Sequence, residues 1–175
     1  MGYDIRELTA SVPVEEYLRT CVDVEKFLGF CRQCGNYEKI WACPPFSFDP
    51  MDIWRAYRTL HIYAWILTPD RDMTMEALMD SFRTEKLRLS RKVLELEGTV
   101  PGSRSMAAST CIACSPCTRV QGRPCRHPEQ VRYSIEALGG DVARTMETYL
   151  HTPIQWARDG KLPPYLTLAA GLLTR

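Results

Sequence analysis

Cysteine thiols, arranged in two spaced groups, are the side chains of this chain best suited to chemistry. Cys111, Cys114 and Cys117 follow one another at intervals of three, and Cys125 comes shortly after, in a segment rich in arginine and proline. One loop can wrap a single iron–sulfur cluster with three thiolates at this spacing and a fourth nearby, and bacterial ferredoxins use the same opening. The spacing therefore predicts that these four cysteines bind a 4Fe-4S cluster.

A second group of cysteines lies nearer the start of the chain. Cys31 and Cys34 form a C-x2-C pair, and Cys43 follows between a tryptophan–alanine pair and two prolines. These three are predicted metal ligands, and a fourth ligand could be Cys21, a cysteine of the other group, a non-cysteine group or an exogenous molecule. A three-cysteine cluster would leave one iron open to a substrate, and a structural zinc is the plain alternative. Cys21 is expected to be a small buried hydrophobic residue.

Zinc is the competing metal for the whole set. Zinc sites usually pair two C-x2-C knuckles in a tetrahedron, and Cys111 and Cys114 with Cys31 and Cys34 could supply such a pair. The third cysteine of the later group would then have no role. The spacing therefore favours iron–sulfur chemistry, as one or two clusters, with zinc as the alternative.

Composition bounds the class of protein and its compartment. The chain has 175 residues, 45% of them hydrophobic, which is enough for a core in a single metal-binding domain spanning residues 1–175. The 22 basic and 21 acidic residues nearly balance, which argues against a nucleic-acid partner. Neither a signal peptide nor a membrane-length apolar segment is recognisable. We therefore expect a cytoplasmic protein, in whose reducing compartment the thiols bind metal rather than form disulfides.

Other candidate groups are weaker. His61 lies in an apolar segment and is expected to pack in the core, His151 is expected at a helix end, and Ser134 is expected at a helix start. The sequence has no phosphate-binding loop, dinucleotide fingerprint or zinc-protease motif. Whether the protein is an enzyme is left open, and so is its oligomeric state.

Hydrophobic patterns predict the elements that must position these groups. A short helix with a following turn is predicted at 12–28. Helices are predicted at 52–57, 74–96 and 128–138, with another begun by Asp141, and strands at 60–68 and 104–110. The apolar run 165–173 fits a strand or a buried helix, and 29–50 is predicted as a cysteine- and proline-rich loop. The order predicts an α/β fold, with a small mixed sheet flanked by helices and cysteine-rich loops at one edge.

Taken together, the motifs resemble a prokaryotic family of small cysteine-rich proteins described as predicted metal-binding proteins of unknown function. The matching pieces are Cys31-x2-Cys34, Trp41-Ala42-Cys43-Pro44-Pro45, Cys111-Ile112-Ala113-Cys114-Ser115-Pro116-Cys117, Pro124-Cys125-Arg126-His127-Pro128, Tyr133–Gly139 and Asp141-Val142. The resemblance implies metal binding through these seven cysteines, of iron–sulfur type, and it implies no particular reaction.

Three functions remain open from the sequence. The first is an iron–sulfur protein that carries electrons or supports a redox enzyme, with a redox partner protein. The second is a redox enzyme whose open-iron cluster at Cys31, Cys34 and Cys43 binds a small substrate. The third is a zinc-stabilised interaction module.

Overall fold

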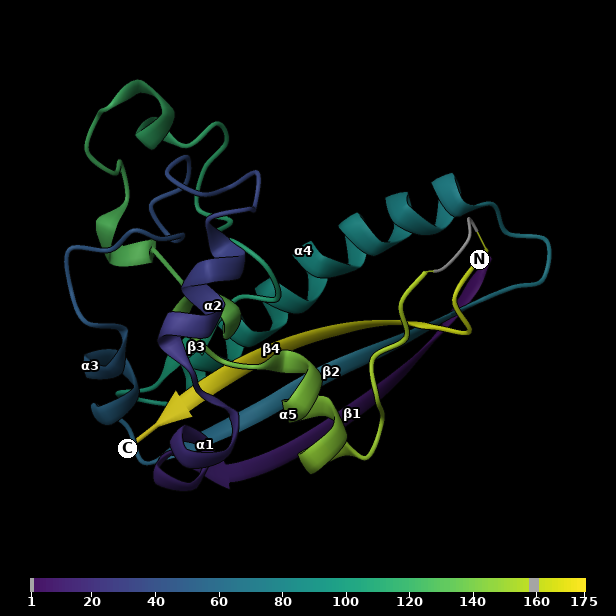
Figure 1. Cartoon of the computed structure of the whole chain (residues 1–175), viewed down its shortest axis with the longest axis horizontal. Coiled ribbons are helices and arrows are strands. Elements are labelled where there is room, and N and C mark those ends of the chain that lie inside the picture. The colour runs from purple at the N-terminus through teal and green to yellow at the C-terminus, as the bar shows by residue number, and fades with distance from the viewer. Residues whose placement is uncertain (1, 158–160) are drawn as a thin grey trace.

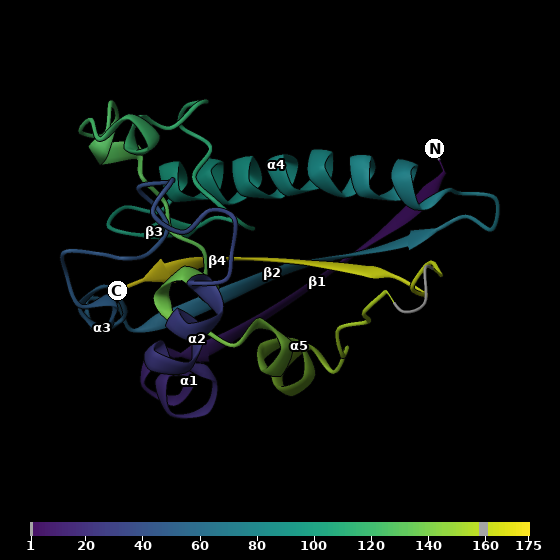
Figure 2. The same ribbon diagram turned by 45° about the horizontal axis from the view of Figure 1, so that its top comes forward.

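The computed structural model describes residues 2–157 and 161–175 as a four-stranded antiparallel sheet with helices on both faces (Figures 1 and 2). The strands lie in the order β1, β2, β4, β3, with β1 at Tyr3–Pro13, β2 at Thr59–Pro69, β4 at Leu166–Thr174 and β3 at Arg104–Met106. The predicted α/β fold with a sheet flanked by helices is confirmed. All of the described strand pairings are antiparallel, so the sheet is antiparallel rather than mixed as expected.

The central strand β2 is the element that the sequence predicts best. Its β-branched and aromatic residues suit a pleated, buried surface, and it pairs with β1 along one edge and β4 along the other. The C-terminal apolar run is also a strand, β4, which decides between the two alternatives left open for it. Strand β1 is absent from the sequence prediction because it is an edge strand with charged, exposed residues such as Arg6 and Glu7.

Helix α4, Met75–Thr99, covers one face of the sheet, while α1, Val14–Cys21, and α5, Val142–Leu150, lie on the other (Figure 2). Alternate residues of β2 explain this division. Trp65 packs in the cluster that contains Leu89 of α4, whereas Ile66 packs with Met146 of α5. The predicted helix at 74–96 is confirmed, and the Thr74 hydroxyl caps it by accepting a hydrogen bond from the Ala77 amide at 3.2 Å.

Residues 12–28, predicted as a short helix with a following turn, contain α1 and the first part of a second helix that the sequence did not predict. After α1 the chain is extended at Val22, and Asp23 then starts α2, Val24–Cys31, by accepting a hydrogen bond from the Lys26 amide at 3.0 Å. An Asp that caps the backbone in this way competes with a continuous helix. The short helix α3, Pro50–Arg55, matches the one or two turns predicted at 52–57.

The helix predicted at 128–138 is wrong. Only two 3₁₀ turns form, η2 at Pro128–Gln130 and η3 at Glu136–Leu138, and the chain between them pairs with the segment after β3. There the Ala107 amide donates to the Tyr133 carbonyl at 2.9 Å. This pairing also ends β3 at Met106, earlier than the predicted 110, so β3 pairs with β4 only at Gly171–Leu173.

Two further features of the fold concern the site and the surface. The first half of β4 has no strand partner on its β3 side within the described residues. Among residues 2–157 and 161–175, no helix is long and apolar enough to cross a membrane.

Candidate metal centre

Two cysteine-bearing loops lie side by side at one end of the molecule (Figures 1 and 2). We call residues 31–49 the first cysteine loop and residues 107–128 the second cysteine loop. The Arg119 guanidinium joins them by donating hydrogen bonds to the carbonyl oxygens of Ile40 at 2.9 Å, Cys43 at 2.5 Å and Pro45 at 2.8 Å. Both loops were expected near strand ends at one end of the fold, and the structure confirms this.

A second contact strengthens the junction between the loops. The Trp41 indole N–H donates to the Arg123 carbonyl at 3.2 Å, and the Arg119 guanidinium lies 5.0 Å from the Trp41 ring centroid. Arg126 instead donates to the Pro116 carbonyl within its own loop. In the structure, the guanidinium groups of Arg119 and Arg126 and the carbonyl group of Arg123 hold the loops in shape.

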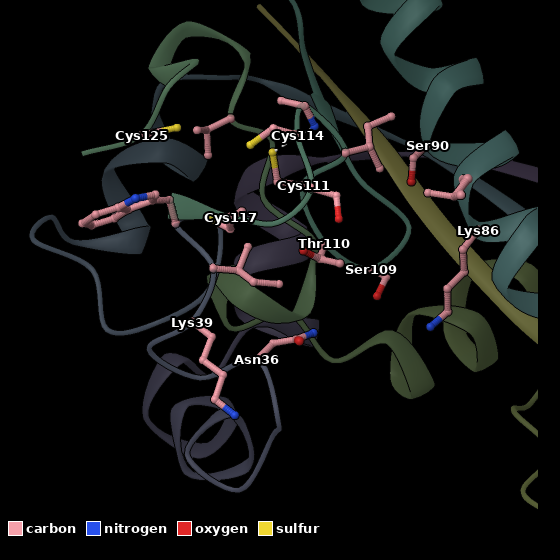
Figure 3. Close-up of a pocket in the computed structure, with 18 of the residues that line it drawn as sticks. Asn36, Lys39, Lys86, Ser90, Ser109, Thr110, Cys111, Cys114, Cys117 and Cys125 are labelled. Atoms are coloured by element: carbon pink, nitrogen blue, oxygen red, sulfur yellow. Dashed lines mark hydrogen bonds between the residues drawn. The ribbon is translucent and has the colours of Figure 1, made fainter. Parts of the chain in front are cut away.

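The second cysteine loop surrounds a cavity of about 790 Å³ (Figure 3). Its four cysteines, Cys111, Cys114, Cys117 and Cys125, all line this cavity. The Ala113 amide donates to the Cys111 sulfur, with a nitrogen-to-sulfur distance of 3.5 Å. Backbone donors directed at ligand sulfurs stabilise the negative charge of a metal–thiolate centre.

The base of the second cysteine loop is fixed to α4. Arg132 donates two hydrogen bonds to the Glu97 carboxylate, at 2.7 and 2.5 Å, and the Ser105 amide donates a third at 2.7 Å. Burial alone would raise the pKa of Glu97, but the hydrogen bonds from Arg132 and Ser105 outweigh it and hold this pKa below its usual value. The Ala108 amide, where the chain leaves the sheet, donates to the Ser90 hydroxyl at 3.0 Å.

The thiols share a cavity but are not arranged as a ligand cage. In residues 2–157 and 161–175, no three His, Cys, Asp or Glu side chains converge closely enough to hold a metal ion. All eight cysteines are free thiols rather than disulfides, so the donors are available. The hydroxyl of Thr110, in the same cavity, is buried without a hydrogen-bond partner. A set of four thiols fits a thiophilic metal or an iron–sulfur cluster in donor type, number and location.

Cys31, Cys34 and Cys43 line a second cavity, of about 860 Å³. It adjoins the first cavity, because Asn36 and Lys86 line both. Burial raises the pKa of Cys43 to about 12, with a further contribution from Cys34. The Cys43 thiol is therefore protonated at neutral pH without a metal, and metal binding there must release this proton.

The second cavity also contains charged residues that the sequence did not single out. Glu136, in η3, has one carboxyl oxygen that is buried without a partner, and burial raises its pKa. Lys86 reaches the cavity from α4, and burial lowers its pKa against the opposing influence of Glu136. No local spacing could have identified this pair, because the two residues are fifty positions apart in the sequence.

Several residues weighed from the sequence prove to be structural. Cys21 is 2% exposed in the main core, which confirms the expectation for it. His61 hydrogen-bonds Ser11 and Thr174 on the neighbouring strands, at 2.8 and 3.1 Å. Trp54, which follows the first cysteine loop in the sequence, is a fully buried core residue.

The chain matches one family of known proteins. Residues 19–173 match the family described as predicted metal-binding protein (DUF2284), and this range includes both cysteine groups. No curated protein and no solved structure matches the chain significantly.

Proposed function

The chain belongs to the family of predicted metal-binding proteins (DUF2284), and we propose that its metal centre is a 4Fe-4S cluster held by Cys111, Cys114, Cys117 and Cys125. The observation that carries this proposal is that four free thiols from one loop all line one cavity. Such a cluster accepts and releases single electrons. The proposed function is electron transfer, or support of a redox enzyme, by a cytoplasmic protein that forms one domain over residues 1–175.

The residues around the loop support this role. The Ala113 amide would stabilise the charge on the Cys111 ligand, and Arg119 holds the second cysteine loop against its neighbour. Val120, on the same loop, is 55% exposed. An exposed apolar side chain beside the loop suits the docking of a redox partner protein, because transient electron-transfer contacts are small.

Metal and sulfide analysis of anaerobically purified protein tests the proposal. We expect brown protein with about four iron atoms and a matching amount of acid-labile sulfide per chain. Reduction with dithionite should give the electron paramagnetic resonance signal of a reduced cluster. Colourless protein with stoichiometric zinc and no sulfide would reject the proposal and favour a zinc-stabilised interaction module.

The cavity beside Cys31, Cys34 and Cys43 favours a second candidate function, a redox enzyme with an open-iron cluster. These three thiols lie against a large, partly apolar cavity that also contains Glu136, as a substrate-binding metal site requires. This candidate requires about eight iron atoms per chain. An iron count near four would leave electron transfer as the better function.

A further inference from the structure

Three polar side chains belong to the wall that the two cavities share. Asn36 of the first cysteine loop, Lys86 of α4 and Ser109 of the second cysteine loop each line both cavities. All three are half-buried rather than fully buried, so they keep surface that a ligand can contact. In the view of Figure 3, the Ser109 side chain lies between those of Asn36 and Lys86. We call these three residues the polar junction.

The packing of the second cysteine loop on α4 brings two members of the polar junction close together. The Ala108 amide donates to the Ser90 hydroxyl at 3.0 Å, which places the adjacent Ser109 against α4. Lys86 precedes Ser90 by one helical turn, so the two lie on the same face of α4, about 6 Å apart. Asn36 reaches the same wall from the first cysteine loop.

The donors of the polar junction have no protein partner. Within residues 2–157 and 161–175, the side chains of Asn36, Lys86 and Ser109 make no hydrogen bond, and Lys86 makes no ion pair. The Lys86 ammonium instead lies 4.9 Å from the Phe82 ring centroid. An ammonium group carries three N–H donors, a carboxamide two and a hydroxyl one. Several free donors beside an ammonium group suit an anionic oxygen ligand.

The surrounding charges also favour an anion. The charged residues that line the cavity of the second cysteine loop are all basic, namely Lys39, Arg83, Lys86 and Arg91. Among the described residues, only Arg83 of these four forms an ion pair. In the neighbouring cavity, the Lys26 ammonium lies 3.7 Å from the Asp141 carboxylate, so these two charges offset each other. Burial raises the pKa of Glu136, which favours the neutral form of the other carboxyl group there.

The cavity of the first cysteine group offers an apolar wall directly beside Lys86. Phe82 lines it next to the Lys86 ammonium, and Phe27 and Phe30 line it from α2, with ring centroids 5.6 Å apart. Phe30 is 57% exposed, and Trp156 on another side of the cavity is 68% exposed. Aromatic side chains that stay exposed around a cavity mark a site for an apolar ligand. An anionic group bound at Lys86 would bring its attached body against this wall.

We propose that the polar junction binds the carboxylate of a small aromatic acid, whose ring extends into the cavity of the first cysteine group. The Lys86 ammonium pairs with the carboxylate, and Asn36 and Ser109 donate hydrogen bonds to it. The acid would be the substrate of the second candidate function and rests on that function only for this role, since its binding does not depend on the metal. An acidic partner protein would use the same cations but would give the aromatic wall no role.

Calorimetric titration of the anaerobically purified protein at physiological ionic strength tests this site. The probes are benzoate, trans-cinnamate and 2-naphthoate. Benzamide, trans-cinnamamide and 2-naphthamide are the matched controls, because they keep the shape of each acid without its charge. Acetate and inorganic phosphate supply an anion without a ring. We expect at least one acid to bind about tenfold or more tightly than its amide, acetate and phosphate.

Substitutions then locate the binding. Lys86→Met should weaken the acid about tenfold or more and leave the amide unchanged, because it removes the charge but keeps the length of the side chain. Ser109→Ala should weaken the acid about threefold, since it removes one uncharged donor. Lys92→Met is the matched control on the same helix: its ammonium pairs with Glu7 at 2.5 Å and lines neither cavity, so this variant should bind the acid normally.

Several results would overturn the proposal. These are no binding of any acid, equal binding of an acid and its amide, binding of acetate or phosphate as tight as that of the aromatic acids, or unchanged acid affinity in Lys86→Met. Tighter binding of hexaglutamate than of every aromatic acid would also overturn it and would favour an acidic partner protein. Iron and sulfide are measured on the same samples, so failure of the iron–sulfur proposal would be seen separately from failure of this one.

Discussion

The two cavities at the cysteine end of the molecule differ in where their thiols and other polar groups come from. The cavity of the second cysteine loop receives all four of its thiols from one segment of the chain, Cys111–Cys125. The cavity of the first cysteine group is lined by α2, α4, η3, β4 and the segment after α5, and it contains three thiols, a carboxyl group and an ammonium group. Helix α4 and the first cysteine loop also line the cavity of the second cysteine loop, but all of its thiols come from one segment, whereas the cavity of the first cysteine group collects its polar groups from distant elements.

This difference indicates that the two cavities have different binding roles. A loop that supplies every donor can hold a metal centre with little help from the rest of the fold. A cavity with apolar walls and a few unsatisfied polar atoms is the usual form of a small-molecule site. Because Asn36 and Lys86 line both cavities, a ligand in one lies near the metal centre proposed for the other.

Removal of a thiol from the second cysteine loop should have the largest effect. Cys111→Ser, Cys114→Ser, Cys117→Ser and Cys125→Ser should each lose the metal of this loop, because one loop that binds one cluster tolerates few ligand losses. Metal content per chain, measured anaerobically, checks this. Cys21→Ser is the control, since this residue is buried in the core and should keep its metal. Equal metal loss in Cys21→Ser and Cys111→Ser would contradict the assignment.

The next largest effect should fall on the cavity built from distant elements. Gly139 has a φ of 86°, and a Cβ there would lie 2.7 Å from the Cα atom of Val24. Gly139→Ala should therefore push α2 away from η3 and cost about 3 kcal/mol of the free energy of unfolding. Urea denaturation measures the loss, and the metal of the second cysteine loop should remain.

Gly98→Ala is the matched control for this prediction. Gly98 lies within α4, and a Cβ there would meet nothing within 4 Å. The variant should gain about 0.5–1 kcal/mol, because alanine favours the helix. If Gly139→Ala were as stable as Gly98→Ala, the close packing of α2 on η3 would not be required for this cavity.

Breaking the junction between the two loops should have an intermediate effect. Arg119→Gln removes most of the hydrogen bonds to Ile40, Cys43 and Pro45, and should cost about 2 kcal/mol. Amide hydrogen exchange should become faster in both cysteine loops. Arg126→Gln loses only a bond within the second loop, so exchange in the first loop should not change. Identical exchange patterns in the two variants would show that Arg119 does not couple the two cysteine loops.

The smallest effect should come from removing the Glu97 carboxylate at the base of the second cysteine loop. The loss of stability should depend on pH. The folded protein holds the pKa of Glu97 below its unfolded value of about 4.3, so the stabilisation is complete above that pH and is lost as pH falls through the folded pKa. Glu97→Gln should be about 1–2 kcal/mol less stable at pH 7. The difference between the two proteins should shrink below pH 4, as measured by urea denaturation. A constant difference down to pH 3 would reject this role.

The sequence predicts the elements whose own pattern is strong. Helix α4, strand β2 and the cap at Asp141 were all predicted from local periodicity and capping chemistry, and all are present. It missed β1 because the exposed, charged residues of an edge strand carry no apolar signal. It predicted a helix at 128–138 because it could not foresee the pairing of Ala107 with Ser134, which holds that segment extended.

The two cavities also differ in how far the sequence predicts the groups that line them. The sequence alone predicts the donor set that we propose for the second cysteine loop, since thiols at i, i+3 and i+6 lie on one loop whatever the rest of the chain does. Only the tertiary structure places Glu136, Thr167 and Lys86 on the wall of one cavity with Cys31. Spacing carries information within one segment, whereas a cavity between segments depends on which faces pack. That packing is decided by burial of the whole core rather than by any one motif.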